Sequence, residues 1–251
     1  MTTQPNHRHQ SSRSRAFFLP ILLACLLVAL VVGGVFAWRW MQKPTSFPIS
    51  HVVVQGELTH ITPQALEKTI TSQLTGGFFS LNLEAIKTAV LVYPWIESVS
   101  FRRVWPDTLR VRLEEQKPLA RFGVTGVLNI AGHVFYPDSK TIPADLPLLE
   151  GPVDEAASLT AFYQNATVLA KFIGLTIHFL SMDPQHGWVL QLSNEVIVKM
   201  GRQDVLNRFK RFVAIYPKIV ASSKETLVSV DLRYPDGFAV RFSSTLKTLK
   251  K

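Results

Sequence analysis

An uninterrupted apolar run near the amino terminus constrains this chain more than any other feature. Residues 17–38 contain no Asp, Glu, Lys, Arg or His. At about 1.5 Å of rise per residue, a helix over this run would cross the roughly 30 Å hydrocarbon core of a bilayer. A cleavable signal peptide usually has an apolar core of only about 7–15 residues, and bulky Phe36 and Trp38 flank the candidate cleavage site at Ala37. We therefore predict an uncleaved single-pass transmembrane helix, with Trp38 and Trp40 at the interface.

The basic residues around this run predict its orientation. Arg8, Arg13 and Arg15 precede it without any acidic residue, whereas only two basic residues occur within residues 39–48. Lys and Arg are enriched on the cytoplasmic side of membrane helices. Residues 1–16 are therefore expected to form a cytoplasmic tail, and the chain beyond the helix is expected to be exported.

Most of the chain's net charge of +9 belongs to this topology signal. The first 43 residues hold five Arg and Lys and no acidic residue, which leaves 22 basic against 18 acidic residues, a net +4, in the rest. Such a modest excess does not indicate a nucleic-acid-binding surface. The sole cysteine, Cys25, lies inside the apolar run, so a packed core rather than disulfides must stabilise the exported part.

The first exported segment has the pattern of a two-layer α+β unit. A linker with two prolines, residues 39–48, is expected to be extended, and the unit itself covers residues 49–117. Period-two and helical apolar spacings alternate in the order β-α-α-β-β. The expected elements are a strand at 49–55, helices beginning near Thr62 and Asn82, and two strands joined by a turn at Trp105-Pro106-Asp107. Trp95 and Trp105 are expected to be core residues that lock the helices to the last two strands.

Pro118 marks a boundary, after which short strands predominate. Residues 118–243 are predicted to form a mixed β-sheet domain with two flanking helices, and residues 244–251 a short basic tail. The segment Thr141–Pro152, with its prolines, is expected to be a loop. Tyr234-Pro235-Asp236-Gly237 separates the last two expected strands, and Asp-Gly at this spacing predicts a hairpin. A fragment from Ser46 to Lys117 is expected to unfold cooperatively without the β domain.

Catalytic and metal-binding motifs are missing from the sequence. It contains no Gly-x-Ser-x-Gly, His-Glu-x-x-His, phosphate-binding glycine loop or Cys-x-x-Cys. The exported histidines are scattered at no metal-ligand spacing. Asp183 and His186 flank a turn, but no nucleophile accompanies them. We therefore expect a protein that is not an enzyme, with no catalytic residue, metal or cofactor.

Three blocks of sequence lie in a fixed order behind the apolar run. They are Tyr93-Pro94-Trp95-Ile96 through Trp105-Pro106-Asp107 to Arg121, Met200-Gly201-Arg202 with Arg208, Arg211 and Phe212, and Val230-Asp231-Leu232-Arg233-Tyr234 with Gly237. In this order and spacing they resemble the FtsQ/DivIB family of bitopic cell-division proteins. The resemblance implies a POTRA domain (polypeptide-transport-associated fold) followed by a β domain. It also implies a scaffold that links early and late division proteins in the inner membrane at the septum.

The same resemblance implies a partner-binding site near the carboxyl terminus. The matching positions are Arg202, Arg233, Tyr234, Gly237 and Phe242. The resemblance implies that the β domain holds the FtsB–FtsL pair and that Arg202, Arg233 and Tyr234 bind FtsB, with the arginines facing partner carboxylates and the tyrosine serving as an aromatic anchor. Phe242 falls where relatives carry an aromatic residue, which would pack on the same segment. FtsW, FtsI, FtsK and FtsN are further candidate partners. An exposed edge of the final strand would let a partner segment add to the sheet.

Other interpretations remain open at the level of sequence. The basic residues of the second block, together with Lys210, are also typical of a solvated helix face, and Tyr234 is also typical of an ordinary strand. The alternative function is an inner-membrane POTRA scaffold, or a transport-assembly component, outside cell division. Membrane fractionation and localisation to midcell separate these possibilities.

Overall fold

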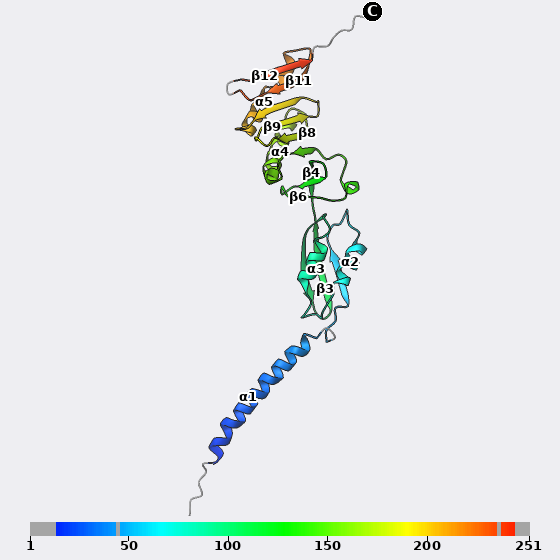
Figure 1. Ribbon diagram of the computed structural model, residues 1–251, viewed down its shortest axis with the longest axis vertical. Coiled ribbons are helices and arrows are strands. Elements are labelled where there is room, and N and C mark those ends of the chain that lie inside the picture. Colours follow the sequence, from blue (N-terminus) through cyan, green and yellow to red (C-terminus); the bar gives the residue numbers. More distant parts are fainter. Residues whose placement is uncertain (1–13, 44–45, 235–236, 244–251) are drawn as a thin grey trace, which may run out of the picture. The chain divides into compact units, whose positions relative to one another are not determined.

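The computed structural model describes residues 14–43, 46–234 and 237–243 (Figure 1). Residues 1–13 of the cytoplasmic tail predicted at 1–16, the predicted tail at 244–251, and Pro235 and Asp236 of the expected hairpin turn lie outside these residues. Helix α1 (Ser14–Met41) is longer than the predicted span and includes the first residues of the expected linker. Its segment Leu22–Met41 is long and apolar enough to cross a membrane.

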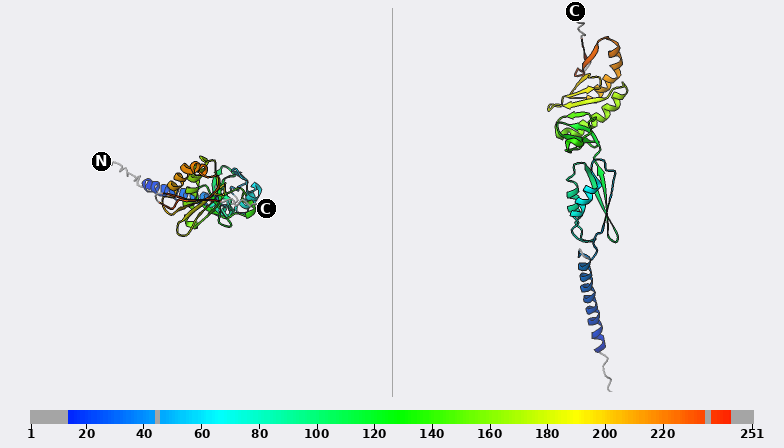
Figure 2. Two further views of the ribbon diagram at one scale, coloured as in Figure 1. Left: turned by 90° about the horizontal axis from the view of Figure 1, so that it is seen from above. Right: turned by 90° about the vertical axis from the view of Figure 1, so that its right-hand side faces the viewer.

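The α+β unit has the predicted order β-α-α-β-β. Strands β1 (His51–Gln55), β2 (Ile96–Val104) and β3 (Thr108–Glu115) form a sheet in the order β1-β3-β2, with β1 parallel to β3. Helices α2 (Pro63–Ser72) and α3 (Leu83–Val90) lie on one side of this sheet (Figure 2, right).

Apolar side chains at the expected spacings join these two layers. The side chain of Asn82 accepts a hydrogen bond from the Ala85 N–H at 3.1 Å, as an N-terminal cap of α3 should. The central strand β3 presents its alternate residues to the helices, because side chains of period two share one face. The buried residues of this layer are Leu66, Ile70, Ile86, Val90, Leu109, Val111 and Leu113.

The second sheet has nine strands in the order β12-β11-β10-β9-β8-β7-β4-β5-β6. Helices α4 (Ala156–Lys171) and α5 (Val205–Ala221) contribute Leu159, Phe209 and Phe212 to its core, and they lie on one face of the sheet (Figure 2, right). The strands are β4 (Pro118–Phe122), β5 (Gly126–Asn129), β6 (Val134–Phe135), β7 (Leu148–Glu150), β8 (Ile177–Met182), β9 (Trp188–Leu192), β10 (Ile197–Gly201), β11 (Thr226–Asp231) and β12 (Ala239–Ser243). The predicted α+β class is confirmed.

The chain contacts divide the protein into two compact units that do not follow the predicted boundary. One unit contains the chain up to Gly56 with residues 63–90 and 99–113, and the other contains residues 57–62, 91–98 and the chain from Glu114 onward. The predicted boundaries at 48/49 and 117/118, and the independent folding of residues 46–117, stay predictions.

An aromatic cluster explains why residues 57–62 and 91–98 belong to the second unit. Trp95 is only 4% exposed and packs with Val127 and Phe135. Its indole N–H donates to the Thr141 hydroxyl at 2.8 Å, and the His60 ring stacks on it at a centroid distance of 3.6 Å. Trp95 is therefore a core residue as predicted, but it packs with β5 and β6, so the prediction that it locks the POTRA helices to the last two strands of that unit was wrong.

Two other local predictions were wrong. Trp105 is 60% exposed, because it lies in the β2–β3 turn rather than on a strand face that the helices cover. The segment Thr141–Pro152 contains strand β7 and the end of a short 3-10 helix at Ser139–Thr141. Leu149 is fully buried in β7, so apolar burial outweighs the proline-rich surroundings.

Candidate functional site

Strand β12 forms an open edge of the nine-stranded sheet. It pairs antiparallel with β11, and no other strand of the described residues lies beside it. Four of its five residues are exposed, and only Phe242 is half-buried. The outward N–H and C=O groups of such an edge can pair with a strand from another chain.

Two of the predicted site residues meet at one end of the neighbouring strands. Strands β10 and β11 are parallel, so their carboxyl ends lie at the same edge of the sheet. Arg202 follows β10 directly, and Arg233 follows β11 after one residue. Both line a pocket of about 360 Å³, which we call the arginine pocket. Its other lining residues are Asp183, Gly187, Gly201, Gln203 and Arg208.

Asp231 holds the guanidinium of Arg233 in place. Nε of Arg233 lies 2.9 and 3.0 Å from the two carboxylate oxygens of Asp231, and Nη2 lies 2.6 Å from Oδ2. Hydrogen bonding to Arg233 lowers the pKa of Asp231 below its ordinary value of 3.8. A guanidinium has five N–H donors, so the groups on Nη1 and the second hydrogen on Nη2 remain for another acceptor. Asp231 thus orients Arg233 without using all of its donors.

Gly201 and Arg208 form the floor of the arginine pocket. Nη1 of Arg208 donates to the Met200 carbonyl oxygen at 2.6 Å. Gly201 has φ +78°, and a Cβ there would lie 2.8 Å from Nη1 of Arg208 and 3.3 Å from Cγ of Arg233. The missing side chain of Gly201 therefore lets both arginines pack over the backbone at the end of β10.

A second, mainly apolar pocket lies between α5 and the start of β12. It has a volume of about 290 Å³ and contains the predicted site residue Gly237. Phe238, which is 44% exposed, directly precedes β12 and contributes its ring to the lining. The pocket is lined by Arg211, Ala214, Ile215, Leu232, Gly237 and Phe238. We call this the α5–β12 pocket.

The remaining two predicted residues lie apart from each other. Tyr234 is exposed and directly follows Arg233, so it borders the arginine pocket along the chain. Phe242 pairs with Leu227 and packs partly against the domain core. It lies three residues, about 10 Å, along β12 from Ala239, which pairs with Asp231. The structure thus groups Arg202 and Arg233, with Tyr234 next in sequence, and places Phe242 toward the far end of the edge.

Sequence reasoning missed two contributors to this surface. Arg208 is in the second block of the family resemblance, but it was not among the predicted site residues; it bonds to Met200 and lines the arginine pocket. Phe238 was expected inside the last strand, but it lies just before it. Arg208, Arg211 and Ile215 recur at three- and four-residue spacing, so they share one face of α5. This spacing in the sequence could have predicted that Arg208 lies on the same face of α5 as two residues of the α5–β12 pocket.

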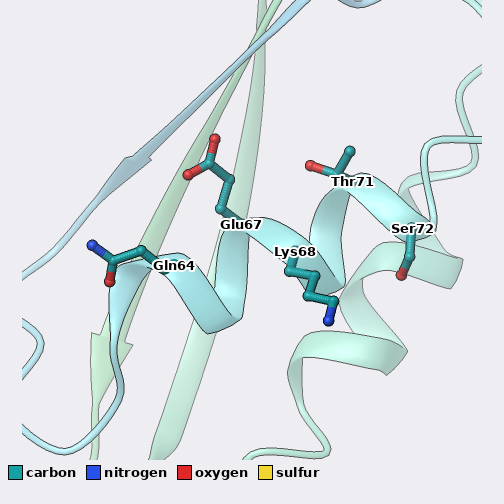
Figure 3. A pocket seen from close by; sticks show the side chains of 5 residues that line it. All are labelled: Gln64, Glu67, Lys68, Thr71 and Ser72. Carbon is teal, nitrogen blue, oxygen red and sulfur yellow. The ribbon is translucent and has the colours of Figure 1, made fainter.

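The α+β unit offers one further surface hollow, on α2. Figure 3 shows Gln64, Glu67, Lys68, Thr71 and Ser72 along this helix, where they line a hollow of about 510 Å³. The lining carries both signs of charge and no apolar anchor. Among the described residues, no group of three or more His, Cys, Asp or Glu side chains could hold a metal ion.

The described residues form an amino-terminal helix long and apolar enough to cross a membrane, a POTRA-type unit and a β domain with an open edge strand. The FtsQ-type POTRA domain family matches residues 47–116, and the carboxyl-terminal domain of cell division protein FtsQ/DivIB matches residues 119–233. The chain therefore belongs to the FtsQ/DivIB family of cell-division proteins.

Individual relatives agree with this assignment. Cell division protein FtsQ of Allochromatium vinosum is 35% identical over 89% of this chain and 89% of its own length. The FtsQ proteins of Coxiella burnetii and Shewanella oneidensis are 32% and 33% identical. These matches cover 94% and 87% of this chain, and 96% and 83% of the respective relatives. The family favours a role in cell division over a POTRA scaffold outside it.

Proposed function

We propose that this protein is a non-enzymatic scaffold of the divisome that binds FtsB, and through it FtsL, at the β12 edge. α1 anchors the protein in the inner membrane at the septum, with the amino terminus in the cytoplasm and both folded units in the periplasm. The observation that carries the proposal is the open edge of β12, flanked by the arginine pocket at one end. FtsW, FtsI, FtsK and FtsN are proposed as further partners of the assembly.

The chemistry of the edge fits an extended, acidic partner segment. A strand added to β12 would gain backbone hydrogen bonds, and its side chains would alternate between the two faces of the sheet. Arg202 and the unused donors of Arg233 would bind its carboxylates. Tyr234, Phe238 and Val240 are exposed and supply apolar contact area.

A titration with a peptide from the carboxyl-terminal region of FtsB tests this proposal. In the full chain in detergent, Arg233→Glu and Tyr234→Ala should each weaken binding by about 2 kcal/mol, roughly 30-fold. Arg121→Glu and Tyr136→Ala are matched controls, because both residues are exposed and lie in β4 and directly after β6, in the opposite half of the sheet from β12. The controls should retain wild-type affinity.

Melting curves of all four variants separate binding from folding. Unchanged affinity in stably folded Arg233→Glu and Tyr234→Ala would remove the β12 edge from the binding site. The hollow on α2 would then be the next surface to test by substitution at Glu67 and Lys68.

Topology is tested separately with reporters fused after Lys251. A periplasm-active reporter should be active there and a cytoplasm-only reporter silent, because the arginines lie before the span. The opposite pattern would reject the orientation. A mature amino terminus near Ala37 would instead show that the apolar run is a signal peptide.

A further inference from the structure

Five aromatic rings gather at one end of the POTRA unit, and three of them, Trp40, Phe79 and Trp105, are exposed. The Phe47 ring lies 5.3 Å from Trp105, 5.6 Å from Phe79 and 5.7 Å from Trp40, measured between centroids. Phe78 contacts both Phe79 and Trp105. Trp105 and Phe79 are nevertheless 60% and 43% exposed. Exposed apolar area of this kind commonly marks an interaction site.

The strand register fixes where this cluster lies within the unit. The N–H groups of Ser50 and His51 both donate to the Asp107 carbonyl oxygen, at 3.0 and 3.3 Å, and His51 pairs with Thr108. The β2–β3 turn with Trp105 is therefore held at the start of β1 (Figure 1). Likewise the Phe78 N–H donates to the Phe47 carbonyl oxygen at 2.7 Å. The rings thus lie at the end of the unit where the chain enters from α1.

The short connection to α1 limits how far this end can be from a membrane. Phe47 is only six positions after Met41, the last residue of α1, so five residues lie between them. A chain spans at most about 3.5 Å per residue, so the separation cannot exceed about 20 Å in any orientation of the unit. Trp38 and Trp40 already place aromatic rings at the end of the candidate span.

The charges near the cluster favour an anionic surface. Arg39 is in the last turn of α1 and Lys43 follows the helix, and Arg102 and Arg103 lie near the end of β2, with Val104 between them and the β2–β3 turn. Nη2 of Arg103 donates to the Leu81 carbonyl oxygen at 3.1 Å, which holds this guanidinium close to the Phe78–Leu81 segment. Among the neighbouring groups, Asp107 lies 3.8 Å from His51, so its charge faces that side chain. Tryptophan rings beside cationic side chains are typical of proteins at the lipid headgroup level.

We propose that this end of the POTRA unit docks on the bilayer crossed by α1, with Trp105 and Phe79 in the headgroup region. The ligand is the lipid surface itself, and anionic headgroups contact Arg102 and Arg103. The docking rests on the proposed anchoring by α1, and it limits the orientations that the POTRA unit can adopt above the membrane.

Depth-dependent quenching in vesicles tests the docking with the full chain. In a Cys25→Ser background, one environment-sensitive fluorophore is attached at Ser80→Cys, beside Phe79, and in a second protein at Gln55→Cys. Gln55 lies four residues beyond His51 on β1, about 13 Å farther from the cluster. Lipids with a quencher near the headgroup should cause loss of fluorescence at position 80 and none at position 55. Adding an anionic phospholipid should increase that loss.

The outcomes distinguish the docking of the POTRA unit from the anchoring by α1. Equal responses at positions 80 and 55 in protein that floats with the vesicles would overturn the docking and leave the anchor intact. Protein that does not float would overturn both. A combined Trp105→Ser and Phe79→Ser variant should lose the quenching at position 80 while still floating. The two labelled proteins both retain all five aromatic residues, so the comparison between positions 80 and 55 is valid even if the double variant does not fold.

Discussion

The two edges of the nine-stranded sheet are built in opposite ways. At one edge β6 has only two residues, and its Phe135 is buried against Trp95. At the other edge β12 has five residues, and most of its side chains are exposed. A short, covered edge strand prevents pairing with other chains, whereas a longer exposed one invites it. The comparison identifies β12 as the edge available to a partner and β6 as an edge used for the protein's own cohesion.

Polar groups show the same contrast. Asn129, fully buried beside β6, has both ends of its amide satisfied. Its Nδ2 donates to Gln116 at 2.8 Å, and its Oδ1 accepts from the Ala131 and His133 N–H groups. Arg233, beside β12, keeps N–H donors beyond its bonds to Asp231. Closed networks favour stability and open ones favour binding.

The largest expected effect concerns the closed edge. Trp95→Ala should lower the free energy of unfolding by about 3–5 kcal/mol, because it leaves a cavity between Val127 and Phe135. Tyr136→Ala, an exposed aromatic residue next to β6, should change it by less than about 0.5 kcal/mol. Urea unfolding of both variants measures the difference. If Trp95→Ala changes the free energy of unfolding only slightly, the packing of Trp95 at the β6 edge does not stabilise the fold.

A glycine from each half of the sheet gives the next comparison. Gly201 and Gly123 both have positive φ, +78° and +57°, but a Cβ at Gly201 would meet two arginine side chains within 4 Å, whereas one at Gly123 would meet open space. Alanine at either position should cost about 1–2 kcal/mol of stability. Only Gly201→Ala should also lower the affinity for the FtsB peptide, because its methyl group would displace the side chains of Arg208 and Arg233. If both variants bind the FtsB peptide equally well, the arginine pocket does not contribute to peptide binding.

The smallest effect is the titration of Asp231. Arg233 lowers the pKa of this carboxyl, so its NMR titration midpoint should fall below 3.8 and return toward that value in Arg233→Gln. The ion pair's contribution to stability is complete above the ordinary pKa and is lost as the pH falls through the lowered one. A midpoint at or above 3.8 in the wild type would contradict the pairing.

Periodicity was enough to predict most of the fold. Residues such as Leu109 and Val111, or Phe209 and Phe212, recur at strand or helix spacing, and burial follows from that spacing. The two tryptophans of one sequence block show the limit. Trp95 and Trp105 have the same chemistry, but one is covered by Phe135 from a distant segment and the other lies in a turn. Such coverage depends on tertiary contacts that local patterns do not encode.

The candidate site was only partly accessible to the same reasoning. Arg202 and Arg233 are 31 positions apart in sequence and meet because β10 and β11 are parallel, which neither strand's own pattern specifies. The hydrogen bond from Arg208 to the Met200 carbonyl oxygen depends on the missing side chain of Gly201, which is a tertiary contact that the sequence pattern does not specify.

Strand β7 has a consequence for cooperativity. It lies between β8 and β4 in the sheet, yet it pairs over three residues with β8 and over two with β4. Local opening costs least where few hydrogen bonds must break, so native-state amide exchange should divide the sheet at β7. Strands β8–β12 would then form one foldon and β4–β6 another. The half with the proposed binding edge would stay folded while the half next to Trp95 opens and closes.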